Sequence, residues 1–141
     1  MATILETVEQ LPVTVVPPRG VLVAEGERSG KLFVLKSGNL DIVRDGSVVA
    51  TLSDPGEVVG EMSALLDLPH TATVRARAGA EVYIVDDPDA FLDARPALGR
   101  EIARALALRL HRTTAHLVDL RARAKDREDQ QMLDKIFALL K

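Results

Sequence analysis

Residues 55 to 74 hold the densest grouping of side chains with chemical potential in this 141-residue chain. The stretch reads PGEVVGEMSALLDLPHTATV, in which Glu61 opens an apolar turn of helix and Thr71 and Thr73 lie at the entry to a strand. A carboxylate can accept a hydrogen bond from a sugar hydroxyl, and the backbone amides at a helix start donate to anions. The grouping therefore suits a bound ribose phosphate.

The same stretch resembles the phosphate-binding cassette of cyclic nucleotide-binding domains. The family pattern is Gly-Glu, an apolar turn of helix, and then Pro-Arg-Thr-Ala-Thr-Val. Here His70 stands where that pattern has the arginine that neutralises the cyclic phosphate. Histidine has an unperturbed pKa of about 6.5 and is mostly neutral at pH 7, so the loss of one charge-assisted hydrogen bond would weaken binding by about 10- to 150-fold.

The resemblance also implies a role for each matching residue. Gly60 lets the backbone approach the ligand, and Glu61 accepts from the ribose 2′-hydroxyl. The amides of the first helical turn, the Thr71 hydroxyl and the Ala72 amide hold the phosphate. The implied ligand is cAMP or cGMP, with cAMP preferred. The implied cyclic nucleotide contacts in this segment are Gly60, Glu61, Met62, Ser63, His70, Thr71 and Ala72.

Each of these residues has an ordinary structural interpretation as well. Glu61 is also what a solvated charge at a helix start would look like, and Thr71 and Thr73 are β-branched residues that favour strands. His70 follows Leu-Pro in what reads as a surface loop, where a single histidine is often only solvated.

The elements that position the segment follow from local patterns. Thr3-Ile-Leu-Glu6 is a capping box and predicts a short opening helix that ends before Pro12. From Val13 to Asp86, short apolar runs are separated by turn residues, and Asp45-Gly46 is the strongest hairpin signal. The other separators are Pro17-Pro18, Gly26, Ser37-Gly38, Pro55-Gly56 and Gly79. This pattern predicts a mainly β fold with flanking helices, an eight-stranded antiparallel β-roll of the jelly-roll type.

Helices are predicted after the strands. Asp86 or Asp87 with Pro88 is typical of a capped helix start, and Pro96 opens a second helix with neither glycine nor proline from Arg100 to Lys141. A 3,4-spaced apolar stripe on that helix predicts a parallel homodimer seam. Its members are Ala103, Leu106, Leu110, Thr113, Leu117, Leu120 and Ala124. A second stripe of Leu98, Ile102 and Ala105 is predicted to pack on the β-roll, and a kink or break is expected between Lys125 and Asp129.

This long helix is similar to the dimer helix of the catabolite activator family, on the residues Arg109-Leu-His-Arg-Thr-Thr-Ala-His116. In that family two adjacent hydroxyl residues of the helix meet the base, and the matching pair here is Thr113 and Thr114. The resemblance implies that ligand occupancy is coupled to the geometry of the dimer helix. Alternatively, Thr113 is only a tolerated seam residue and Thr114 only a surface residue.

The predicted organisation is an N-terminal helix over 1–12, the cyclic nucleotide-binding β-roll over 13–95, the dimerisation helix over 96–125 and a short C-terminal helix over 126–141. Family members that regulate transcription carry a helix-turn-helix domain after the dimer helix, and residues 126–141 are too few to form one. The expected output is therefore a protein partner that docks on residues 128–141, or a domain outside this chain.

Composition excludes several other functions. The net charge of −3 argues against direct nucleic acid binding, and the absence of cysteine excludes thiolate chemistry. His70, His111 and His116 lack metal-ligand spacing, and no nucleophile is paired with a base, so neither a metal site nor an enzyme is expected. No run approaches the roughly 20 apolar residues of a spanning helix, which favours a cytoplasmic protein. The competing interpretation is a β-roll dimerisation or interaction module that has lost nucleotide binding or binds another small anion.

Overall fold

The computed structural model describes residues 3–140 and divides into two units, one extending to Ile102 and the other beginning at Ala103. The described strands are β1 (Val13–Val16), β2 (Val21–Val23), β3 (Leu32–Arg44), β4 (Ser47–Leu52), β5 (Val58–Val59) and β6 (Thr73–Val85). The described helices are α1 (Ile4–Val8), α2 (Glu61–Leu66), α3 (Pro88–Ala94), α4 (Pro96–Arg123) and α5 (Arg127–Ala138).

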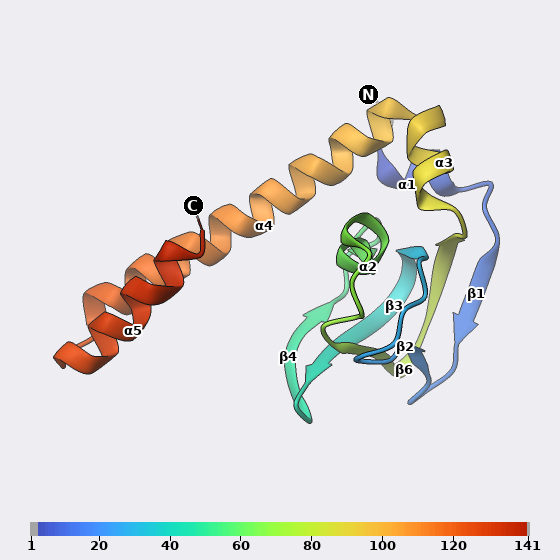
Figure 1. Ribbon diagram of the computed structural model, residues 1–141. Helices are drawn as coiled ribbons and strands as arrows, with labels where there is room; N and C mark the ends of the chain where they lie inside the picture. The colour runs from blue at the N-terminus through green and yellow to red at the C-terminus, as the bar shows by residue number, and fades with distance from the viewer. Residues whose placement is uncertain (1–2, 141) are drawn as a thin grey trace. The chain divides into compact units, whose positions relative to one another are not determined.

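All six of these strands join one antiparallel sheet in the first unit. Its main order is β1-β6-β3-β4, with β2 also paired to β6 and β5 also paired to β3 (Figure 1). The predicted mainly β fold with flanking helices is confirmed. The Asp45-Gly46 hairpin is confirmed too, since β3 and β4 pair across it and both turn residues have positive φ, 51° and 77°.

The strand count differs from the expected eight because two strands are long and bent. β3 and β6 each run for 13 residues, through the Ser37-Gly38 and Gly79 positions that were expected to be turns. At those positions the pairing of β3 with β6 shifts register, and Gly38 and Gly79 adopt φ of 85° and 107°. Glycine permits this conformation without strain. The two glycines therefore mark bulges inside continuous strands, not the ends of strands.

Capping determines where α1 and α3 begin. The Glu6 amide donates to Thr3 Oγ1 at 3.2 Å and the Thr3 amide donates to Glu6 Oε2 at 3.1 Å, so the predicted capping box is present. Asp87 caps α3 through the Ala90 amide at 3.2 Å, and Pro88 is the first helical residue. Both helix starts follow from residues within three positions of the cap.

The hydrophobic core of the first unit is formed by side chains of the sheet strands. Its members are Val16, Val23, Phe33, Leu35, Leu40, Val59, Val74, Ala76, Ala80 and Val82. At the start of α4, Leu98 and Ile102 are only 2% and 3% exposed, whereas Ala105 is half-buried. Leu98 and Ile102 of the predicted second stripe are thus buried. Burial of this apolar face anchors the first turns of α4.

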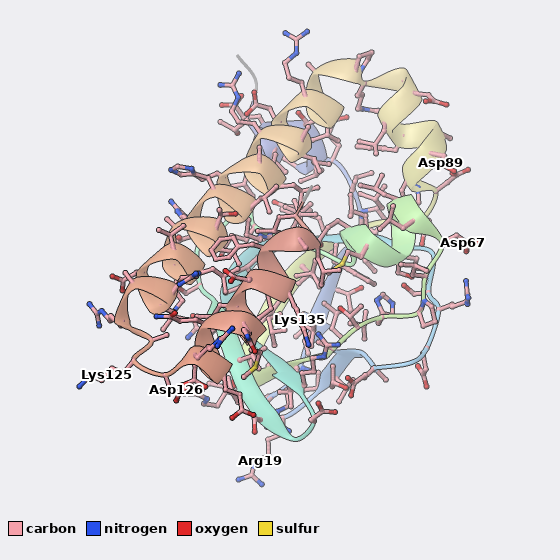
Figure 2. The ribbon with its side chains drawn as sticks, turned by 60° about the vertical axis from the view of Figure 1, so that its left-hand side comes forward. Arg19, Asp67, Asp89, Lys125, Asp126 and Lys135 are labelled. Atoms are coloured by element: carbon pink, nitrogen blue, oxygen red, sulfur yellow. The ribbon has the colours of Figure 1, made fainter. Side chains whose placement is uncertain are left out.

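In the second unit, α4 ends at Arg123 and α5 begins after Asp126, whose side chain accepts from the Asp129 amide at 2.7 Å. The interruption over residues 124–126 begins one residue earlier than the break expected from sequence. Figure 2 labels Lys125 and Asp126 at this turn. An ion pair joins the two helices, with Arg121 Nε 2.6 Å from Asp134 Oδ1.

Four of the seven residues of the predicted seam are exposed in the single chain, namely Ala103, Leu110, Thr113 and Leu120. Leu110 and Leu120 are 52% and 41% exposed, and Leu106, Leu117 and Ala124 are half-buried. Exposed leucines on a stripe with alternating steps of three and four residues are typical of a surface that another helix covers. Across residues 3–140, no helix combines the length and apolar character needed to cross a bilayer.

Candidate functional site

The site is built around the turn that starts α2. Gly60 precedes the helix with a φ of 87°, in the left-handed region. A Cβ on Gly60 would lie 2.9 Å from the Lys31 carbonyl oxygen and 3.7 Å from His70 Cε1. Only glycine tolerates both this φ and this approach. The turn thus brings the start of α2, the Lys31 backbone and the His70 ring together.

Burial divides the predicted contacts into two groups. Glu61, Ser63 and His70 are buried, with exposed fractions of 7%, 4% and 6%. Met62 is 46% exposed, Thr71 is exposed and Ala72 is half-buried. A buried carboxylate next to first-turn amides is unusual for a surface helix, because Glu is rarely buried without a partner. The solvated-charge interpretation of Glu61 therefore does not fit its burial.

Three hydrogen bonds hold His70 in place, two from its backbone and one from its ring. Its amide donates to the Glu27 carbonyl and its carbonyl accepts from the Gly26 amide, both at 2.9 Å. Its Nε2 lies 2.9 Å from Ser29 Oγ, which also accepts from the Lys31 amide at 3.2 Å. The hydroxyl proton of Ser29 is thus available to an unprotonated Nε2.

Burial lowers the pKa of His70 below its ordinary value of 6.5, and the nearby Glu27 carboxylate only partly opposes this effect. Desolvation disfavours the charged imidazolium, so the ring is neutral at pH 7. The alternative interpretation, a solvated loop histidine, does not match a residue that is only 6% exposed. At the position of the family arginine, this chain places a buried, neutral ring.

The loop between β2 and β3 lies along the end of the cassette. The Glu25 amide donates to Thr73 Oγ1 at 3.0 Å, in addition to the Gly26 and Glu27 bonds to His70. Arg28 donates to the Asp67 carbonyl and approaches Asp67 Oδ1 at 3.3 Å. Figure 2 labels Asp67 at the end of α2. Residues 25–29 were missed as site residues, because their partners lie about 40 positions away and no local pattern marks them.

Thr113 and Thr114 belong to the second unit and are described there by themselves. The Thr113 hydroxyl donates to the Arg109 carbonyl at 2.9 Å, a bond within the helix, and the residue is exposed. Thr114 is half-buried. Thr113 therefore already has one hydrogen bond, although its oxygen can still accept another.

Over residues 3–140, no group of three His, Asp or Glu side chains is placed to hold a metal ion. A buried carboxylate, first-turn amides and a neutral imidazole can recognise hydroxyl and anionic groups.

Comparison with known proteins shows that the same segment matches a known family. A family model described as cyclic nucleotide-binding domain matches residues 13–94. The match covers all six described strands, α2 and all of α3, and it includes every candidate residue of the cassette.

Individual relatives agree with this match. The chain is 37% identical over 112 residues to a CRP-like cAMP-activated global transcriptional regulator of Mycobacterium tuberculosis, covering 73% of this chain and 49% of the relative. It is 37% identical over 70 residues to a cAMP-dependent protein kinase regulatory subunit of Yarrowia lipolytica, covering 48% of this chain and 18% of the relative. The crystal structure of the Thermus thermophilus catabolite activator protein matches with a TM-score of 0.69 and 25% identity, over 81% of this chain and 56% of that chain. The chain thus spans about half the length of the transcriptional regulator it matches.

Proposed function

Because the chain belongs to the cyclic nucleotide-binding domain family, we propose that it is a regulatory sensor whose ligand is cAMP, bound at residues 60–72. The preference for cAMP over cGMP is supported by identities of 37% to a cAMP-activated transcriptional regulator and to a cAMP-dependent kinase regulatory subunit, against 31% and 35% to two cGMP-dependent protein kinases. Neither of the two cAMP-related names describes catalysis by the matching segment, which supports a role in regulation and not in an enzymatic step.

The observation that carries the proposal is the buried Glu61 at the start of α2, directly after the left-handed Gly60. We assign Glu61 to the ribose 2′-hydroxyl and the amides of the first helical turn, with Met62 and Ser63, to the phosphate. Thr71 and Ala72 close the phosphate site from the strand entry. A carboxylate that accepts from a hydroxyl in a partly desolvated site contributes more than a solvated one.

His70 makes this site weaker than an arginine-bearing one. A neutral ring bonded to Ser29 offers no permanent positive charge to the phosphate. The anion would then be held mainly by backbone amides and hydroxyls. We expect a Kd in the micromolar range, since losing one charge-assisted bond reduces affinity by about 10- to 150-fold.

The proposed output is a change in the geometry of a homodimer. The partner for the exposed Leu110 and Leu120 would be the same stripe of a second copy. In that dimer Thr113 and Thr114 would lie near the base of the bound nucleotide. A ligand can shift the arrangement of the helices only through its different affinities for the two arrangements. Residues 128–141, with Met132 56% exposed on α5, are a candidate surface for a further protein partner.

Calorimetric titration tests the binding proposal. We expect saturable cAMP binding to the wild-type chain, and a loss of about 10-fold or more in affinity for Glu61→Gln, which keeps the volume but removes the charge. Glu9→Gln, at an exposed position after α1, is the matched control and should bind as the wild type does. If Glu61→Gln and Glu9→Gln bind cAMP equally well, the proposed role of Glu61 is wrong.

A second candidate function is favoured by one observation, the buried and neutral state of His70. In that case the chain is a β-roll interaction module that has lost nucleotide binding or accepts a different small anion. A ligand that binds the native state raises the melting temperature by mass action. No shift of the melting temperature with millimolar cAMP or cGMP would favour this second function.

A further inference from the structure

The outer face of the sheet carries arginines around a buried carboxylate. Val74 and Ala76 of β6 point into the core and are 4% and 0% exposed. Side chains alternate along a strand, so Arg75 and Arg77 point to the opposite face, where both are exposed. Asp41 of β3 lies opposite Arg75 in the register. The three charged groups therefore share one face.

Asp41 holds Arg77 in a fixed orientation. Its carboxylate accepts from Arg77 Nε at 3.0 Å, from one Arg77 Nη at 3.2 Å and from Thr51 Oγ1 at 2.8 Å. Asp41 is 3% exposed, whereas the Arg77 side chain is 71% exposed. The guanidinium has five N–H donors and only part of its fork faces Asp41. The remaining donors of Arg77 are held in place on the solvent side.

Arg19 lies close to these residues because it is part of a tight turn that is hydrogen-bonded to β6. The Gly20 amide donates to the Pro17 carbonyl at 2.7 Å, and Arg19 occupies the third turn position with φ of 65°. That position favours glycine, so a bulky arginine is out of keeping with local preference. The Arg19 amide donates to the Ala76 carbonyl at 2.7 Å and the Ala76 amide donates to the Gly20 carbonyl at 2.9 Å. These bonds fix Arg19 beside β6.

Arg19, Asp41, Val48, Arg75, Ala76 and Arg77 line a groove with a volume of about 470 Å³. Ligand pockets in proteins have volumes of roughly 300–1,000 Å³. Three guanidinium groups against one carboxylate leave two positive charges in excess. Within residues 3–140, the side chains of Arg19 and Arg75 make no ion pair or hydrogen bond. Figure 2 shows the Arg19 side chain extended away from the ribbon.

We propose that this groove is a second binding site, specific for a compact dianion such as a phosphate monoester or a dicarboxylate. The arginine guanidinium group can bind a phosphate or a carboxylate through two parallel hydrogen bonds. The exposed Val48 on β4 offers an apolar contact to the body of the ligand. A purely structural role accounts for the Asp41–Arg77 pair and for the weaker attraction between Arg75 and Asp41, but it leaves Arg19 without a function. The groove shares no residue with the segment 60–72, so the two sites are separable by mutation.

The arginine Nε–Hε signals in an NMR titration test the proposal. Adenosine 5′-monophosphate and succinate are added separately at constant ionic strength, with cAMP present throughout. A saturable shift of the Arg75 and Arg77 signals with either compound supports the site and identifies the source of the dianion. Arg75→Gln and Arg19→Gln should each weaken this binding by about 10-fold. Arg77 is left intact, because its loss would leave Asp41 buried and unpaired.

Controls separate a built site from general screening and from the cassette. Arg127→Gln removes one exposed arginine from α5 and should leave the binding unchanged, as should Glu61→Gln. Shifts that grow linearly with both compounds would overturn the proposal. An equal loss in Arg75→Gln and Arg127→Gln would overturn it too. Loss of the response in Glu61→Gln would place the dianion at the cassette and refute the separate site.

Discussion

The replacement His70→Arg tests whether the phosphate of a bound cyclic nucleotide lies beside residue 70. The wild-type ring is neutral, 6% exposed and bonded to Ser29, so it contributes no charge to an anion. Arginine would supply a permanently charged, bidentate fork at the family position. A charge-assisted hydrogen bond is worth roughly 1.5 to 3 kcal/mol, so the Kd for cAMP should fall by about 10- to 150-fold.

The same change has a predictable effect on stability. Removing the imidazole breaks the 2.9 Å contact between His70 Nε2 and Ser29 Oγ. A single such bond contributes about 0.5 to 1.5 kcal/mol, and a larger, charged guanidinium adds a desolvation cost at this buried position, so the free energy of unfolding should fall by at least that amount. The backbone bonds of residue 70 to Gly26 and Glu27 do not involve its side chain and should persist. The variant is therefore expected to fold and to bind more tightly.

Calorimetry at pH 7.5 measures the Kd, and urea unfolding measures the stability. His70→Gln keeps a neutral hydrogen-bonding side chain and should bind cAMP as the wild type does. Gln10→Arg adds the same charge at an exposed position after α1, and should not change the affinity. A folded His70→Arg variant with wild-type affinity, or an equal gain in Gln10→Arg, would refute the placement of the phosphate beside residue 70.

Three further outcomes are expected. Gly60→Ala should lower the free energy of unfolding, measured by urea melts, by about 1 to 3 kcal/mol. The reason is that Gly60 has a φ of 87° and the new Cβ would lie 2.9 Å from the Lys31 carbonyl oxygen. A variant as stable as the wild type would contradict the left-handed turn. The folded-state pKa of His70 is depressed below 6.5, so below about pH 6.5 only the unfolded state gains the proton, and stability should fall from pH 7 toward that lowered pKa. This slope should flatten in His70→Gln, and an identical slope in both proteins would show that another group titrates. In sedimentation experiments, Leu110→Asp combined with Leu120→Asp should give a monomer of 15.3 kDa while the wild type sediments as a dimer; a monomeric wild type would remove the dimer proposal.

Local chemistry was enough to predict the elements whose signals lie within a few residues. The Thr3 capping box, the Asp45-Gly46 hairpin and the Asp87-Pro88 helix start each depend on neighbours in sequence, and each is present. The predicted number of strands was wrong because it also relied only on neighbouring residues. A glycine that ends a strand and a glycine that bends one look alike in sequence, and Gly38 with Gly79 proved to be bends.

The surroundings of the site depended on contacts that no local pattern carries. The burial of His70 arises from pairing with residues 26–29, which lie some 40 positions earlier in the chain. The groove on the outer face was also missed, although the alternation Arg75-Ala76-Arg77 on a predicted strand placed two arginines on one side. The sequence alone did not show that Asp41, on the neighbouring strand, pairs with Arg77.

The pair of bent strands has a consequence for how this fold can change over generations. A methyl group on Gly38 would come within 2.4 Å of the Gly79 carbonyl oxygen, so the two backbones touch where a side chain would otherwise stand. Gly38 cannot change alone, because a new side chain there forces the main chain at Gly79 to move. A Cβ on Gly79 would meet nothing closer than the Val16 carbonyl oxygen at 3.6 Å, so only the φ of 107° disfavours other residues at that position. Descendants of this chain should therefore keep Gly38 more strictly than Gly79.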